Sequence, residues 1–491
     1  MERRESHAIA RVNYAKAGAT KDTPKLARLV IMYRHIRRFL GLPECPNQEL
    51  EKCSFLIYES MEASSRTFHN FEHIMDLSKG ADPIQIAAIA FHDVIYYHID
   101  GGLSNRQREY LHDVIVEKDG IVSITKEKLE TSVEMVMDIF GYKYGQVLDP
   151  YKGMNEFLSA CLGCRIYSLL DRNRCEQTLS LSVNAKCAAC IEATIPFRGP
   201  DDKGRSPPEA LFDRLGCVNE KYDFGWEEAK IVGAVQRAAD LGNRDLENFS
   251  WTDRAAFLSN TWKLLPESNV ALRNHSVYLS ELALAMKKMA GFFEFLNPET
   301  IYFSFRDPKA EAIVTEKTAE AKRNIDTAFV YMRCKYLALS FLSAVAELSG
   351  GDAPISFFTG DLQNTHTPMS ITLENFLGKC EPAKGLEYNE DVWKILHEGR
   401  KLETDFDTKH SPLGAFLYAH IGDVGMKESI KYAVHPMDEE NALLLLQSIP
   451  AKPRLEILSA CSEVALTRRA EIVRIIEELG HDHCAKRKRT N

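Results

Sequence analysis

The sequence predicts an all-α protein, and three observations carry this prediction. Apolar residues recur at three- and four-residue spacing over many long segments, which is the period of an amphipathic helix. Alternating, strand-like patterns flanked by turn dipeptides are scarce. The composition is that of a globular protein, with 45% hydrophobic and 27% charged residues in a chain of 491. This length is enough for two or three domains.

Helical periodicity and its punctuation place the expected helices along the chain. Asp82 followed by Pro83 is a typical helix start, and Gly242 lies where the helix from Trp226 is expected to end. Glycine, proline and charged residues predict loops at 198–208 and 349–354. The expected helices are 26–40, 83–97, 126–140, 155–170, 226–241, 277–296, 327–348 and 455–479.

We expect the helices to form two domains. The polar run 306–327 separates two apolar regions, which places the first domain at 1–325 and a helical domain of unknown role at 326–491. A helix that joins the two regions is the alternative interpretation of this run. The residues 485–491 form a short basic tail.

Charge and hydropathy exclude several classes of protein. The 61 basic and 70 acidic residues give a net charge of -9, which argues against general nucleic-acid binding and against binding to anionic membranes. The 12 cysteines are too few for a disulfide scaffold. The N-terminus lacks the apolar core of a signal peptide, and the longest apolar stretch, 336–348, is too short to span a bilayer. A soluble, cytoplasmic protein is expected, with export by a route that needs no signal peptide as the alternative.

The segment 66–93 concentrates groups that bind metal ions. His69 and His73 are four residues apart and are expected on one face of a helix. His92 and Asp93 follow near the end of an apolar helix, where an imidazole and a carboxylate are costly to bury unless they are paired or bound to a metal. Such donors suit Zn, Mn, Fe or Ni, and we expect a divalent metal ion, with Co and Mg as further candidates.

The sequences FHNFEH and AFHDVIY resemble the HD superfamily, specifically its predicted metal-dependent phosphohydrolases with a YHN-x-x-H segment before the His-Asp dipeptide. The resemblance covers about residues 25–300 and implies a helical bundle. It implies metal ligands at His69, His92 and Asp93, with His73 as the second histidine of the first segment.

The resemblance also implies a closing aspartate about one domain downstream. Asp240, in the sequence AADLGN, is the expected ligand, and Asp245 is the alternative. Asn243, between them, is expected beside the substrate or behind the ligands.

The chemistry implied by the resemblance is metal-assisted hydrolysis of a phosphomonoester or phosphodiester, with a nucleotide or related small molecule as the expected substrate. Asp93 or Asp240 would accept a proton. Arg66 matches an arginine just ahead of the first histidine, and together with Arg198 it would offset charge on the phosphate.

Other interpretations stay open. An inactive HD scaffold that binds a nucleotide or a partner protein is one alternative, and an HD-type di-iron oxygenase extended by His98 and His112 is another. A protein partner or self-association through the C-terminal domain is a further possibility. The pairs Cys161-x2-Cys164 and Cys187-x2-Cys190 have the spacing of a zinc site, although buried thiols explain them as well.

Overall fold

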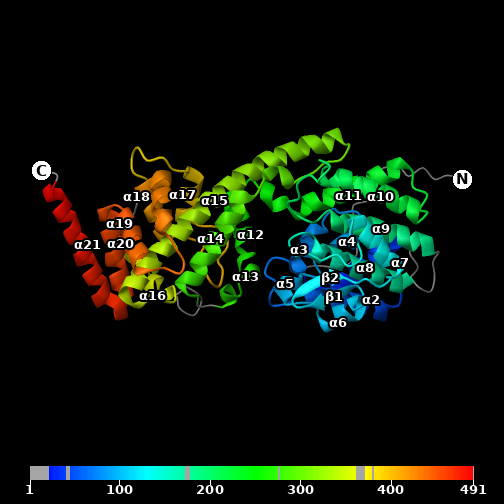
Figure 1. Ribbon diagram of the computed structural model, residues 1–491, viewed down its shortest axis with the longest axis horizontal. Helices are drawn as coiled ribbons and strands as arrows, with labels where there is room; N and C mark the ends of the chain where they lie inside the picture. The colour runs from blue at the N-terminus through cyan, green and yellow to red at the C-terminus, as the bar shows by residue number, and fades with distance from the viewer. Residues whose placement is uncertain are drawn as a thin grey trace. The chain divides into compact units, whose positions relative to one another are not determined.

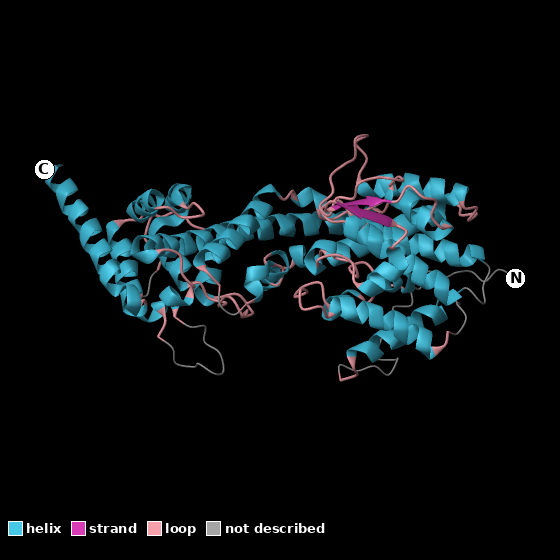
Figure 2. Cartoon of the chain, turned by 60° about the horizontal axis from the view of Figure 1, so that its bottom comes forward, coloured by secondary structure: helices cyan, strands magenta, loops and turns pink. Residues whose placement is uncertain are grey.

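The computed structural model describes residues 22–39, 45–171, 177–274, 277–360, 371–378 and 381–489, without the side chains of 169–180 and 481–489. The described chain is almost entirely helical, with one short hairpin (Figure 2), which confirms the all-α prediction. It divides into two compact units. The first comprises Met1–Ser250 and Asn297–Ala319, and the second comprises Trp251–Leu296 and Glu320–Asn491.

The first unit contains eleven of the described α-helices and the hairpin. Its elements are α1 (Lys25–Phe39), α2 (Asn47–Met61), α3 (Phe71–Leu77), α4 (Pro83–Ile89), α5 (Tyr97–Asp100), α6 (Asn105–Leu111), β1 (Ile115–Lys118), β2 (Ile121–Ile124), α7 (Thr131–Phe140), α8 (Met154–Asp171), α9 (Gln177–Glu192), α10 (Pro207–Lys221), α11 (Glu228–Asp245), η2 (Glu247–Ser250) and η4 (Pro298–Thr300).

Helices α8 and α9 pack against each other in the first unit, and α7 lies against both. Figure 1 shows α4, α8 and α9 lying together, and α11 also packs on α9. The strands pair antiparallel with Ile115 opposite Ile124. A continuous apolar core joins these helices, so the polar residues described below are held on a rigid support.

Helix α4 starts as expected but ends early. The Asp82 side chain accepts a hydrogen bond from the backbone N–H of Gln85, whose side chain accepts one from the Asp82 N–H, and Pro83 occupies the first turn. The helix was expected to reach residue 97, but it ends at Ile89. His92 and Asp93 therefore lie in the turn that follows the helix.

Helix α11 runs past the glycine that was expected to end it. Gly242 is buried inside the helix, and a Cβ atom there would lie 2.4 Å from the carbonyl oxygen of Ala193. The glycine thus allows α11 to approach the end of α9 closely. The helix continues to Asp245, which becomes its last residue.

The second unit is also helical, and its α15 begins among residues of the first unit. The described elements are α12 (Arg254–Trp262), α13 (Leu265–Ser268), η3 (Val270–Arg273), α14 (Leu279–Phe295), α15 (Pro308–Gly350), α16 (Ser356–Thr359), η5 (Leu373–Phe376), α17 (Glu390–Glu398), α18 (Pro412–Ser429), η6 (Ile430–Tyr432), α19 (Glu439–Ser448), α20 (Ala451–Val464), η7 (Leu466–Arg468) and α21 (Arg469–Arg489).

By length and composition alone, α15 is apolar enough to cross a membrane. Its most apolar window of 18 residues has a mean hydropathy of 1.3, but 83% of that window is buried inside the protein. This is the pattern of a core helix in a soluble protein, as expected for the segment 327–348.

The domain boundary differs from the expected one in one respect. The division falls inside α15, between Ala319 and Glu320, close to the expected boundary at 325. Residues 251–296, however, belong to the second unit and not to the first. The expected helix 455–479 is two helices, α20 and α21. The side chains of the basic tail 485–491, and all of residues 490–491, lie outside the described part of the chain.

Candidate metal centre

The first histidine segment is organised by a helix cap. The Asn70 side chain accepts hydrogen bonds from the backbone N–H groups of Glu72 and His73, at 3.0 and 3.3 Å, and helix α3 begins at Phe71. His69 therefore precedes the helix, and the expectation that His69 and His73 share a helix face is wrong. Only His73 is carried by α3.

His92 is held in one orientation by the end of α4. Its Nδ1 lies 2.8 Å from the carbonyl oxygen of Ile89, and the side chain is buried. Because a carbonyl oxygen only accepts, Nδ1 carries a proton and donates. In the neutral ring the lone pair is then on Nε2, where it can bind a metal ion. A metal-binding histidine is usually held in this way, by a hydrogen bond from the ring nitrogen that does not bind the metal.

Three other side chains approach this Nε2 atom. The Nε2 atoms of His73 and His92 are 3.3 Å apart. Oδ2 of Asp93 lies 2.9 Å from Nε2 of His92 and 3.5 Å from Nε2 of His73. Oδ1 of Asp245 lies 3.1 Å from Nε2 of His73 and 3.5 Å from Nε2 of His92. Helix α3, the turn after α4 and the end of α11 thus meet at one point.

The chemistry of this cluster fits a divalent cation. Oδ2 of Asp93 is buried and has no hydrogen-bond partner of good geometry among the described residues. Potential ligand atoms of His73, His92 and Asp93 lie within 4.8 Å of one another, and no other such group of three occurs in the described ranges. Two imidazole nitrogens and two carboxylates can neutralise a divalent ion, at bond lengths of about 2.0–2.2 Å for zinc.

Without an ion, protons hold the cluster together. Burial lowers the pKa of His73, but Asp245 and Asp93 outweigh it and raise that pKa to about 9. The pKa of His92 is likewise raised, against the effect of burial, by the charge of Asp93. Burial raises the pKa of both carboxyls, yet the histidines hold that of Asp93 well below its usual range and that of Asp245 at about 2. A metal ion that binds here must displace the imidazole protons.

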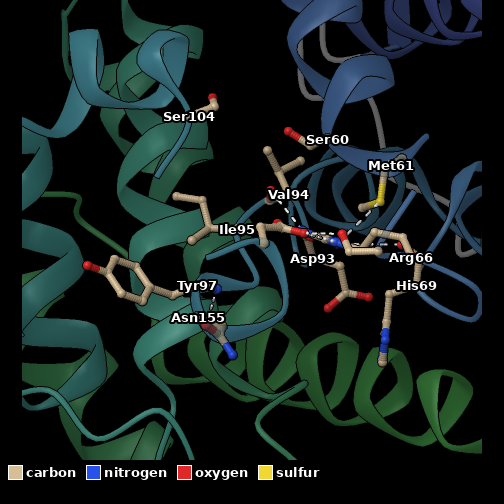
Figure 3. Close-up of polar contacts among 12 residues, drawn as sticks. Ser60, Met61, Arg66, His69, Asp93, Val94, Ile95, Tyr97, Ser104 and Asn155 are labelled. Atoms are coloured by element: carbon tan, nitrogen blue, oxygen red, sulfur yellow. Dashed lines mark hydrogen bonds and ion pairs between the residues drawn. The ribbon is translucent and has the colours of Figure 1, made fainter. Parts of the chain in front are cut away.

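His69 lies beside the cluster. Its ring is 5.9 Å from that of His73 and 4.9 Å from that of Tyr96, in edge contacts, and its charge contributes to the lowered pKa of Asp93. Figure 3 shows the side chains of His69 and Asp93 pointing to the same side of the loop. His69 is therefore placed to contact what approaches the cluster.

Arg66 was expected to face the substrate, but its guanidinium group is fully buried. Nε and one terminal nitrogen bind both carboxylate oxygens of Asp100, at 3.0 and 2.6 Å. The other terminal nitrogen donates to the carbonyl oxygen of Asp93 at 2.6 Å (Figure 3). A bidentate pair of this kind fixes geometry, so Arg66 positions the turn that carries His92 and Asp93.

Asp240, the expected closing ligand, does not reach the cluster. Its carboxylate accepts hydrogen bonds from Gln85 at 2.7 Å and from Arg244 at 2.8 Å, which ties α11 to α4. Five residues along a helix correspond to a rotation of about 140°, so Asp240 and Asp245 point in different directions. Asp245, the alternative, is the residue that the helix turns toward the two histidines.

The other two expected substrate contacts are engaged with the protein. Asn243 donates to the carbonyl oxygen of Phe303 at 2.8 Å and accepts from its N–H at 2.9 Å. Arg198 donates to the carboxylate of Glu192 at 2.6 Å and to the carbonyl oxygen of Ile195 at 3.2 Å, with about a quarter of its side chain exposed. Asn243 is thus a structural residue, whereas Arg198 keeps an exposed edge.

The alternative ligands lie elsewhere. His98 contacts the rings of Tyr97 and Tyr151, and Nδ1 of His112 lies 3.2 Å from the carbonyl oxygen of Glu109. The four cysteines of the two Cys-x2-Cys segments are buried free thiols. None of them belongs to a potential metal-ligand group among the described residues. These cysteines are Cys161, Cys164, Cys187 and Cys190.

Helix α8 contributes residues that the sequence analysis missed. Asn155 accepts a hydrogen bond from the N–H of Tyr97, and Ser159 accepts one from the N–H of Ile95, both at 3.0 Å. Both bonds anchor the chain just after Asp93. The available signal was the spacing of Asn155 and Ser159, which are four residues apart in the sequence MNEFLSACLGC.

Comparisons with models of protein families, with curated proteins and with solved structures found no match for this chain. Inferences about function therefore depend on the geometry and chemistry of the cluster itself.

Proposed function

We propose that the first unit is a metal-dependent phosphohydrolase in which His73, His92, Asp93 and Asp245 hold a divalent ion. The observation that carries the proposal is the convergence of two Nε2 atoms and two carboxylates at one buried point. The resemblance of FHNFEH and AFHDVIY to HD phosphohydrolases supports it independently. This ligand set keeps His73, His92 and Asp93 of the expected ligands, takes Asp245, the alternative, in place of Asp240, and leaves His69 for a contact with the substrate.

The donor set favours hydrolysis. When bound, a divalent ion at this point polarises a phosphoryl oxygen and lowers the pKa of water toward neutrality. The two histidines keep the carboxyl groups of Asp93 and Asp245 ionised, and an ionised carboxylate is the form that can accept a proton from the attacking water. The hydrogen bond from His92 to Ile89 keeps that ring in place during the reaction.

The surroundings suit an anionic substrate. Two neutral imidazoles and two carboxylates balance a divalent ion, so binding of a phosphate needs further donors. His69 lies next to Asp93, and Arg198 has an exposed edge. We assign phosphate contacts to these two side chains, and we assign to Arg66 the positioning of the loop behind them. A nucleotide or related small phosphoester is the proposed substrate.

The test is a hydrolysis screen of purified protein loaded separately with Mn, Zn, Co, Ni or Mg. Phosphomonoesters and phosphodiesters, including nucleotides, are supplied to the wild type and to His92→Ala. Activity that depends on added metal and is lost in the variant supports the proposal. Metal that binds to the wild type without hydrolysis of any phosphoester would favour the alternative of a binding scaffold.

A further inference from the structure

The second unit contains a cavity of about 670 Å³. Its walls come from α15, from residues 355–360 with α16, from η5, from residues 403–411 and from the start of α18. The volume is in the range of about 300–1,000 Å³ that is found for pockets of small molecules. None of the described residues that line the cavity belongs to the first unit, so the cavity is separate from the proposed metal centre.

One face of α15 forms a wall of this cavity. Lys335, Ala338, Leu339 and Leu342 line it, and their spacing places them on the same side of the helix. The charged residue is at one end, and the two turns that follow it are apolar over about 10 Å of the helix axis. The other elements add the apolar residues Ile355, Leu373, Phe406 and Leu413. An elongated apolar group with a polar head at Lys335 therefore fits along α15.

Lys335 belongs to a buried cluster with more positive than negative charge. Its Nζ lies 2.7 and 2.6 Å from the two carboxylate oxygens of Asp407, and Nη2 of Arg400 lies 3.0 Å from one of them. All three side chains are buried, so two cations share one carboxylate. Burial lowers the pKa of Lys335, the charge of Asp407 opposes this, and the charge of Arg400 lowers it further. Because a buried charge without a counter-charge is costly, a bound anion would stabilise the cluster.

The cluster also has hydrogen-bond donors to spare. Nε and Nη1 of Arg400 are buried and have no hydrogen-bond partner among the described residues, although the ring of Trp262 lies 3.8 Å from the guanidinium group. An ammonium group has three protons, and the two oxygens of Asp407 accept only part of the donor capacity of Lys335. Lys335 and Asp407 both line the cavity. A carboxylate, which only accepts, suits this end of the cavity.

The exposed part of the cavity wall disfavours ligands of higher negative charge. Glu374, Glu403 and Asp405 line the cavity and are exposed, and Glu403 accepts a hydrogen bond from the backbone N–H of Lys409 at 2.6 Å. Lys409 supplies one positive charge here, and the pKa of His410 is lowered by burial and by the charge of Lys409, so its ring is neutral. Three carboxylates against one lysine repel a phosphate dianion more than a singly charged carboxylate.

We propose that this cavity binds a small organic acid, with its single carboxylate beside Lys335 and an apolar chain or ring along α15 toward Leu342. The carboxylate balances the excess positive charge of the Asp407 cluster, and the apolar body covers the apolar face of the helix. The inference assigns a ligand to the unit whose role the sequence leaves open. It does not rest on the hydrolase function proposed for the first unit.

The first experiment compares head groups on one eight-carbon chain. Octanoate, octanamide, octyl phosphate and octylamine are titrated into the full chain by isothermal titration calorimetry, below the concentrations at which they form micelles. We expect about one octanoate per chain. Its affinity should exceed that of each other probe by about tenfold or more, the contribution of one hydrogen bond between charged groups.

A second experiment tests the role of Lys335. Lys335→Met leaves Arg400 and Asp407 as a balanced pair, so we expect the fold and the melting temperature to persist while the affinity for octanoate falls about tenfold or more. The matched control is Lys427→Met, which changes an exposed lysine of α18 and should bind octanoate as the wild type does. Circular dichroism checks the fold of both variants.

A third experiment tests the location of the ligand without changing the charged cluster. Thr359→Phe adds a ring at the cavity wall, on α16, and should weaken octanoate binding about tenfold or more by occupying the space of the apolar chain. Thr467→Phe makes the same change at an exposed threonine that does not line the cavity, and it should leave the affinity unchanged.

Several results would overturn the inference. Octyl phosphate or octylamine that binds more tightly than octanoate would contradict the assigned head group, and an octanoate that does not bind would contradict the site. Equal octanoate affinity in folded Lys335→Met and Lys427→Met, or in Thr359→Phe and Thr467→Phe, would place the acid elsewhere. None of these measurements requires metal or phosphoester hydrolysis, so the function proposed for the first unit stands or fails separately.

Discussion

The cluster around Asp407 in the second unit and the cluster of His73, His92, Asp93 and Asp245 in the first unit are built in opposite ways. In the second unit, Asp407 accepts hydrogen bonds from Trp262 at 2.9 Å, from Lys335 at 2.6 and 2.7 Å, and from Arg400 at 3.0 Å. In the first unit, Oδ2 of Asp93 faces the two histidine rings with no hydrogen-bond partner of good geometry among the described residues.

The two clusters differ in their balance of hydrogen-bond donors and acceptors. Around Asp407, strong donors surround one acceptor, and the Arg400 guanidinium also lies 3.8 Å above the ring of Trp262. Such an arrangement neutralises the buried carboxylate of Asp407, whereas Nε and one terminal nitrogen of Arg400 have no hydrogen-bond partner among the described residues, and Lys335 and Asp407 line part of a cavity. The cluster in the first unit instead gathers potential acceptors around one point. Their mutual repulsion is relieved by protons or by a cation.

The largest expected effect comes from removing the negative charge at the centre of the Asp407 cluster. Asp407→Asn leaves the cations of Lys335 and Arg400 without a buried counter-charge, so we expect the free energy of unfolding of the second unit to fall by about 3–5 kcal/mol. Urea denaturation followed by circular dichroism measures it. The matched change Asp93→Asn, in metal-free protein, should cost clearly less. Equal costs would mean that both clusters are structural.

The second largest effect is expected in how the stability of the metal-free protein depends on pH. Burial opposes the rise in the pKa of His73, but the aspartates bring it to about 9, against about 6.5 in an unfolded chain. The folded state then binds more protons, so this stabilisation is present below pH 6.5 and is lost as the pH rises toward 9. The loss is on the order of 3 kcal/mol.

Thermal denaturation of metal-free protein between pH 6 and pH 9.5 measures this loss. His73→Gln should flatten the profile. Metal affinity should rise over the same interval, because ligation requires the neutral ring. A stability that rises with pH in the wild type would contradict the assignment of protons to the histidines.

A smaller effect is expected from changing Gly242, whose close contact with Ala193 helps to position Asp245. Gly242→Ala brings a Cβ within 2.4 Å of the carbonyl oxygen of Ala193, so α11 must shift at a cost of about 1–3 kcal/mol. The shift should also weaken metal binding, since Asp245 lies one turn further on.

The matched control is Gly233→Ala on the same helix, where a Cβ would meet nothing within 4 Å. We expect this change to leave stability the same or to raise it by up to about 1 kcal/mol. Thermal melting and metal titration of both variants give the comparison. Equal behaviour of the two alanine variants would show that the contact with α9 does not position Asp245.

Local patterns predicted local structure well. The cap formed by Asp82 and Pro83 and the period of the long helices are properties of neighbouring residues, and they correctly placed the start of α4 and most of α8 and α14. The choice between Asp240 and Asp245 is different, because it depends on how α11 is rotated against α9. This rotation depends on the close contact between Gly242 and Ala193, two residues that are far apart in the sequence.

Other misplacements have the same origin. Arg66 was assigned to the substrate from the resemblance, and no local pattern connects it with its actual partner, Asp100, which is 34 residues away. Residues 251–296 join the second unit through packing that sequence periodicity does not encode. His69 shows that spacing alone is insufficient, since Asn70 caps the helix between the two histidines.

The most direct test of the proposed centre is the metal content of Asp245→Asn beside Asp240→Asn, two equivalent changes on one helix. Each protein is loaded with Mn, Zn, Co or Ni, desalted and analysed for metal per chain, with circular dichroism to check the fold. We expect about one ion in the wild type and in Asp240→Asn, and a large loss in Asp245→Asn. Full metal content in Asp245→Asn, or loss in Asp240→Asn alone, would contradict the proposed ligand set.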